Sequence, residues 1–115
     1  MKNTRILIFI VAYNHEHFIE SVLERVPREL AKYDTEILII DDASQDRTFE
    51  TAMRYPDEHE LPFKITVLVN PKNQRYGGNQ KIGFHYAIQN SFDILALVHG
   101  DGQYAPEALP DLLAP

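Results

Sequence analysis

Four short apolar segments constrain the fold of this chain more than any other feature of its sequence. They lie at residues 5–11, 35–40, 64–69 and 92–98, and they are rich in β-branched residues. Nearly continuous apolar runs of this kind are typical of strands that are covered on both faces, as in a parallel sheet. The sequence therefore predicts four buried strands.

Helical patterns separate the first three of these segments. Apolar residues recur on one stripe over residues 17–26, which predicts a helix that packs on the sheet. Pro27 breaks or restarts that helix, and residues 28–32 add a further turn. A shorter helix is predicted over residues 47–54, and residues 55–62 form a charged connector.

A third helix is predicted over residues 78–89, between the third and fourth strands. Ile82, Ala87 and Ile88 should be its inward residues. Pro106 suits the first position of a final helix, because its missing N–H has no partner there in any case.

Strands that alternate with helices define a doubly wound α/β fold. We expect a Rossmann-like, mostly parallel sheet in the order third, second, first, fourth, with helices on both faces, since crossover connections are right-handed. A chain of 115 residues is one small domain, spanning residues 1–115. Ligands of such sheets bind beyond the carboxyl ends of the strands, where the chain reverses direction across the sheet.

Conspicuous polar residues stand at those predicted strand ends. Residues 12–16 follow the first strand, residues 41–46 the second and residues 99–103 the fourth. The third strand leads into a polar, glycine-containing loop at residues 70–81. Their common position predicts a single ligand site at this edge of the sheet.

The segment after the fourth strand offers oxygen ligands for a hard cation. Asp101 and Gln103 are spaced by one glycine, and Mg²⁺ or Mn²⁺ prefers a few oxygen ligands together with phosphate oxygens. Gly100 and Gly102 would let a diphosphate approach the backbone closely. The alternative interpretation is a plain Asp-Gly turn.

Two adjacent acids, Asp41 and Asp42, directly follow the second strand. A carboxylate there can accept hydrogen bonds from a ribose or from the N–H of a base, and we assign this function to Asp42. The alternative is a helix cap, which Ser44 or Asp46 could equally supply.

Gly77 and Gly78 open the third helix, where N–H groups can face an anion, and Lys81 adds a positive charge. The segment lacks both the Walker pattern and G-x-G-x-x-G, so it does not predict dinucleotide binding. The alternative is an ordinary loop whose lysine is solvated.

Aromatic and imidazole groups give weaker signals. His15 and His17 are expected at the surface or in a cap, whereas His99, beside Asp101, is a candidate site residue. Tyr13 could stack on a base from its loop.

Composition narrows the class of partner. The net charge of −6 argues against a nucleic acid as partner, whereas a metal ion can join acidic side chains to phosphates. The chain has no cysteine, which fits a reducing compartment such as the cytoplasm. Its first apolar run is short for a signal peptide, and no run approaches the roughly 20 residues of a membrane helix.

Three motifs in this order, at residues 11–16, 41–48 and 100–107, resemble glycosyltransferase family 2 over nearly the whole chain. The most similar branch is that of the dolichyl- or polyprenyl-phosphate mannosyltransferases. The resemblance implies a GT-A fold, a UDP- or GDP-sugar as donor, and Mg²⁺ or Mn²⁺ as cofactor. The family has glycine near Arg75, and an acid where this chain has His99.

The resemblance also assigns functions to residues. Ala12, Tyr13, Asn14 and Glu16 would line the nucleotide pocket, and Asp42 would contact the base or ribose. Lys81 and Gly100 would face the phosphates. Asp101 and Gln103 would bind the metal, with His99 as a further candidate ligand.

The implied reaction is metal-assisted transfer of a sugar to a polyprenyl phosphate or saccharide, with inversion. A full-length protein of this kind is expected in the cytoplasm, and peripheral association with the cytoplasmic face of the membrane is compatible with a lipid acceptor. Family members continue past this point into an acceptor-binding half that holds the catalytic base, so we expect this chain alone to transfer weakly or not at all. The alternatives are a non-catalytic domain that binds nucleotide sugars and a structural module whose acids are caps.

Overall fold

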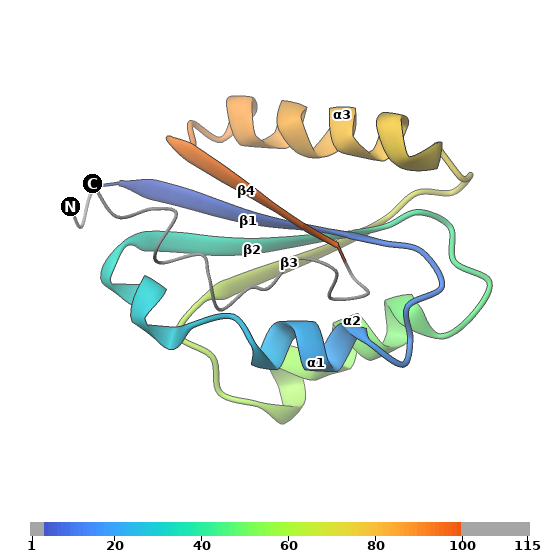
Figure 1. The fold of residues 1–115 in the computed structure, drawn as a ribbon, viewed down its shortest axis with the longest axis horizontal. Coiled ribbons are helices and arrows are strands. Elements are labelled where there is room, and N and C mark those ends of the chain that lie inside the picture. Colours follow the sequence, from blue (N-terminus) through green and yellow to red (C-terminus); the bar gives the residue numbers. More distant parts are fainter. Residues whose placement is uncertain (1–3, 100–115) are drawn as a thin grey trace.

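A computed structural model describes residues 4–99 as a four-stranded sheet with helices on both faces (Figure 1). The elements in chain order are β1 Arg5–Ala12, α1 Ile19–Glu24, the 3₁₀ helix η1 Arg28–Lys32, β2 Asp34–Asp41, α2 Thr48–Glu58, β3 Lys64–Val69, α3 Arg75–Gln89 and β4 Ile94–His99. No helix in this described part is both long and apolar enough to span a membrane.

The strands are all parallel, and their order is β3-β2-β1-β4. This is the predicted order, so the α/β fold with a mostly parallel sheet is confirmed. The chain moves outward from β1 to β3 in one direction and then crosses back through α3 to place β4 on the other side of β1. Figure 1 shows the loops that follow β1, β2 and β3 gathered at the same edge of the sheet.

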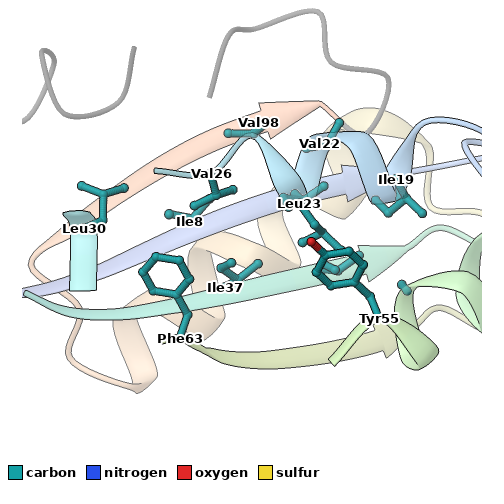
Figure 2. Packing of buried hydrophobic residues seen from close by; sticks show 14 of the residues in the cluster. Ile8, Ile19, Val22, Leu23, Val26, Leu30, Ile37, Tyr55, Phe63 and Val98 are labelled. Atoms are coloured by element: carbon teal, nitrogen blue, oxygen red, sulfur yellow. The ribbon is translucent and has the colours of Figure 1, made fainter. Parts of the chain in front are cut away.

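One face of the sheet packs against α1, η1 and α2. Figure 2 shows the apolar side chains of this layer; Leu23 and Leu30 from the helices belong to the same cluster as Ile8 and Ile37 of the two central strands. Tyr55 of α2 is almost fully buried in the same cluster. Burial of these side chains at about 25 cal/mol per Å² supplies the main stabilisation of this face.

The other face is covered by α3 and holds Leu7, Phe9, Leu38 and Ala87 among its buried residues. Gly83 lies directly against Phe9, because a Cβ added at Gly83 would be 2.1 Å from Cε2 of that ring.

This close approach decides which side of α3 faces the sheet. The prediction that Ile82 and Ile88 point inward is wrong, since their side chains are 36% and 77% exposed, whereas the prediction for Ala87 is confirmed. The inward stripe carries Asn79 and Gly83 in addition to Ala87, and these smaller side chains let the helix approach the sheet.

Helix bounds also differ from the predicted ones. Helix α1 is shorter than expected, and α2 continues to Glu58 with Pro56 inside it. Pro56 has no N–H to donate to the carbonyl of Ala52, and the helix ends two residues after it. Helix α3 begins at Arg75, so both glycines of the 70–81 segment lie within its first turns. The predicted helix at Pro106 lies outside the described residues.

Full burial of all four strands was also predicted, and this is wrong for the two edge strands: β4 is mostly half-buried, and β3 is partly exposed. Leu68 and Val69 are 39% and 48% exposed, because β3 has a neighbouring strand on one side and the helices cover mainly the centre of the sheet. An apolar run alone does not distinguish a central strand from an edge strand.

Candidate functional site

The loops after β1 and β2 are bound to each other by side-chain hydrogen bonds. Asn14 has a positive φ of 55°, a conformation that asparagine tolerates better than most residues. Its N–H donates to Oγ of Ser44 at 2.9 Å, and its Oδ1 accepts from the N–H of Gln45 at 2.9 Å. The two loops therefore form one rigid unit at the carboxyl edge of the sheet.

Asp46 fastens the same two loops one turn further along. Its Oδ1 accepts from the N–H of Thr48, the first residue of α2, at 3.0 Å, and its Oδ2 accepts from the N–H of Glu16 at 3.2 Å. Desolvation raises the pKa of Asp46, but the hydrogen bonds from Thr48 and Glu16 outweigh it and lower the pKa below its ordinary value. Asp46 thus has the capping function that the sequence left open.

Asp41, the last residue of β2, is buried and holds the turn that follows it. Ser44 donates to it from both its hydroxyl and its N–H. Burial raises the pKa of the Asp41 carboxyl even though these hydrogen bonds act in the opposite direction. The function of Asp41 in the described structure is to fix this turn.

Asp42, the second acid of the pair, is the centre of a buried polar network. Its Oδ1 accepts from Nδ2 of Asn70 at 2.9 Å and from the N–H of Gln74 at 2.7 Å. The Asn70 amide also donates to Oδ1 of Asn79 at 3.2 Å, and Asn79 donates to the carbonyl of Ile40 at 3.3 Å. These bonds fix the orientation of the Asp42 carboxyl group and tie it to α3.

A pocket of about 290 Å³ opens at this edge of the sheet, close to the lower end of the range for small-molecule sites. The residues that line it follow or end the four strands, or belong to the start of α3: Val11, Ala12, Tyr13, His15, Asp42, Asn73, Arg75, Asn79 and His99. The position is the one expected for a ligand site in a doubly wound sheet.

Four of the predicted site residues meet in this pocket, namely Ala12, Tyr13, Asp42 and His99. The others are placed differently or lie beyond the described residues. Asn14 and Glu16 contribute the loop contacts given above, Lys81 is exposed on α3 outside the pocket lining, and Gly100, Asp101 and Gln103 lie outside the described residues. Their contacts with a nucleotide or metal remain predictions.

Sequence reasoning missed several lining residues. His15 was expected at the surface or in a cap, but it is half-buried and lines the pocket, and its Nδ1 accepts from the N–H of Tyr13 at 3.3 Å. Asn73 and Arg75 also line the pocket and were missed, because the prediction for the 70–81 segment rested on the two glycines that follow them. The polar character of that loop was the available signal, but it does not reveal which of its side chains turn toward the ligand.

The described residues do not form a metal site by themselves. Within residues 4–99 no group of three or more histidine, aspartate or glutamate side chains could hold a metal ion. His99 lines the pocket at the end of β4 and would supply one ligand to a metal ion. The assignment of a metal to Asp101 and Gln103 stays a prediction, because both residues lie outside the described range.

The sheet order, the helices on both faces and the pocket beyond the strand ends define a GT-A-type α/β domain, and solved structures share this shape. The model of the family described as Glycosyl transferase family 2 matches residues 7–115, and the chain belongs to that family.

Relatives of known activity are similar over most of this chain. The undecaprenyl-phosphate mannosyltransferase of Micrococcus luteus is 30% identical over 109 residues, which cover 95% of this chain and 43% of the relative. The dolichol-phosphate mannosyltransferase of Pyrococcus furiosus is 30% identical over 111 residues, which cover 95% of this chain and 29% of the relative. The chain thus spans less than half the length of these relatives.

Two solved structures illustrate the shared fold. The mannosyltransferase PcManGT from Pyrobaculum calidifontis, in complex with GDP-Man and Mn²⁺, has a TM-score of 0.73 at 20% identity, covering 98% of this chain and 33% of its own. Residues 1–349 of S. aureus TarS, in complex with UDP, have a TM-score of 0.68 at 22% identity, covering 95% of this chain and 31% of their own.

Proposed function

We propose that this chain is the nucleotide-sugar-binding part of a glycosyltransferase that transfers a sugar from a UDP- or GDP-sugar to a polyprenyl phosphate or a saccharide. The observation that carries the proposal is the pocket, which brings Asp42, Tyr13 and His99 together at the carboxyl edge of the sheet. The relatives named above, which act on undecaprenyl and dolichol phosphates, support a lipid phosphate as acceptor.

Asp42 would recognise the nucleoside. Its network fixes the carboxyl group before any ligand arrives, so that an oxygen of the carboxylate can accept a hydrogen bond from a base N–H or a ribose hydroxyl without a further loss of side-chain entropy. Tyr13 is exposed at the pocket and can stack on a base.

The transfer would be a single displacement at the anomeric carbon, with inversion. The acceptor oxygen forms the new bond to that carbon, and the nucleoside diphosphate leaves with the electron pair of the old one. A phosphate oxygen carries no proton to lose, whereas a saccharide hydroxyl would give its proton to a general base. Mg²⁺ or Mn²⁺, if held by Asp101 and Gln103, supplies stabilisation of the charge on the leaving diphosphate. A full-length protein with this function would work in the cytoplasm or at the cytoplasmic face of the membrane, where its lipid acceptor lies.

Calorimetric titration of UDP and GDP into the folded 115-residue chain, with and without Mn²⁺, tests this function. We expect binding to one of the two nucleotides, with an affinity that Mn²⁺ raises in the wild type and leaves unchanged in Asp101→Asn. A chain that circular dichroism shows to be folded, but that binds neither nucleotide, would contradict the proposal.

A non-catalytic nucleotide-sugar-binding domain is the second candidate, because the pocket residues Asp42 and Tyr13 suit the binding of a nucleotide whether or not transfer follows. Sugar transfer to a polyprenyl phosphate by a protein that contains this chain in its full length would exclude it.

A further inference from the structure

Arg75 occupies an unusual position in the pocket. Among the residues that line the described part of the pocket, it is the one with a permanent positive charge, since arginine stays protonated at all relevant pH values. Lys81, the cation that the sequence singled out, is exposed on α3 outside the lining. In a chain with a net charge of −6, a cation placed at the ligand site matters for the binding of an anion.

The backbone of Arg75 is in the left-handed region, with a φ of 60°. This conformation is unfavourable for a residue with a long side chain, whereas glycine adopts it readily. Strained backbone of this kind persists where the surrounding structure enforces it, and it gathers at ligand sites.

Side-chain hydrogen bonds enforce the strained conformation. The N–H of Arg75 donates to Oδ1 of Asn73 at 2.7 Å, and Nδ2 of Asn73 donates to the carbonyl of Asp42 at 3.2 Å. The neighbouring N–H of Gln74 donates to the Asp42 carboxylate at 2.7 Å. The residue that would bind the nucleoside therefore also fixes the turn from which the Arg75 side chain projects.

We propose that the Arg75 guanidinium binds the diphosphate of the nucleotide and supplies the positive charge that the sequence assigned to Lys81. This inference rests on the proposed function. A guanidinium presents paired N–H donors that match phosphate oxygens, and charge-assisted hydrogen bonds of this kind are among the stronger ones. The rigid turn would hold the guanidinium and its paired N–H donors in place before the ligand binds.

Arg75→Gly removes the side chain and retains the backbone conformation, so we expect it to fold with an unchanged or higher melting temperature. Its Kd for UDP or GDP should rise by about tenfold or more, because a charge-assisted hydrogen bond is lost. Arg75→Lys should recover part of the affinity, since it restores the positive charge but not the paired N–H donors of the guanidinium. Lys72→Ala, which removes an exposed charge of the same loop outside the pocket lining, should bind like the wild type.

The same titrations are repeated with uridine and guanosine, which carry no phosphate. The wild type and Arg75→Gly should bind each of these nucleosides with the same affinity. Equal affinities of wild type and Arg75→Gly for the diphosphates would overturn the inference while leaving the proposed function intact. The inference would also be overturned if Lys72→Ala lost as much affinity for the diphosphates as Arg75→Gly does. It would likewise be overturned if Arg75→Gly lost as much affinity for the nucleosides as for the diphosphates. Failure of the wild type to bind any nucleotide would overturn the proposed function and this inference together.

Discussion

Gly83 gives the sharpest test of how α3 is seated on the sheet. In Gly83→Ala the new Cβ would lie 2.1 Å from Cε2 and 2.3 Å from Cζ of Phe9, distances that real contacts never show. The Phe9 ring cannot yield easily, because its side chain is fully buried in the central strand. The helix must therefore move away from the sheet.

Two opposing terms determine the size of the effect. Alanine is favoured over glycine inside a helix by about 1 kcal/mol, whereas overpacking of a tight core costs about 1–3 kcal/mol. The contact is backbone against ring with no flexible end to adjust, so we take the upper end of that range and expect a net loss of about 2 kcal/mol. For a domain of this size, that loss lowers the melting temperature by roughly 10 °C.

Thermal and urea denaturation, followed by circular dichroism, measure the effect, with Gly77→Ala as the matched control. Gly77 lies in the same helix with no atom within 4 Å of an added Cβ, so its substitution should be neutral or slightly stabilising. The displacement of α3 in Gly83→Ala should also weaken nucleotide binding, since Asn79 and Arg75 are carried by this helix. Equal stability of the two alanine variants would refute the reasoning.

Two further predictions concern the hydrogen bonds of the site. Asn79→Ala removes one of the two acceptors of the Asn70 amide and one donor to the Ile40 carbonyl, so urea denaturation should show a loss of about 2 kcal/mol and calorimetry a weaker nucleotide affinity. Gln89→Ala, on the exposed end of the same helix, should change neither, and similar losses in both would contradict the role of the network. Because the native pKa of Asp46 is lowered, the stability that its carboxylate contributes is present above the ordinary value of 3.8 and is lost as the pH falls through the native value. The difference in unfolding free energy between wild type and Asp46→Asn should therefore be large at neutral pH and vanish at strongly acidic pH, and a constant difference across this range would count against it.

The strand order was predictable because it depends on few choices. Parallel strands joined by helices permit a small set of right-handed connections, and the polar residues after the apolar runs identify the ligand edge of the sheet. Apolar periodicity also placed the three helices in the correct intervals between strands.

Features that depend on contacts between distant residues were not predictable. Periodicity favours Ile82 and Ile88 as inward residues of α3, but the direct contact of Gly83 with Phe9 turns them outward. That contact joins residues on different elements, and nothing in the local pattern of residues 78–89 reports it.

In the candidate site, too, local sequence pattern predicted some residues, whereas contacts between distant residues determine others. Asp42 and Tyr13 stand beside apolar runs and were found by their position. Arg75 was missed as a lining residue because its direction depends on a positive φ that hydrogen bonds of Asn73 and Asp42 impose. Residue type alone does not predict a left-handed arginine.

The most direct test of the account is to map nucleotide binding on the chain itself. Amide chemical shifts of ¹⁵N-labelled protein are recorded while UDP or GDP is added, with Mn²⁺ replaced by diamagnetic Mg²⁺. We predict that the shift changes gather at the carboxyl edge of the sheet, at Ala12, Tyr13 and Asn79, and leave Arg5 and Asp93 at the opposite edge unchanged. Shift changes at the opposite edge alone, or none at saturating nucleotide, would contradict the claim that this pocket binds a nucleoside diphosphate.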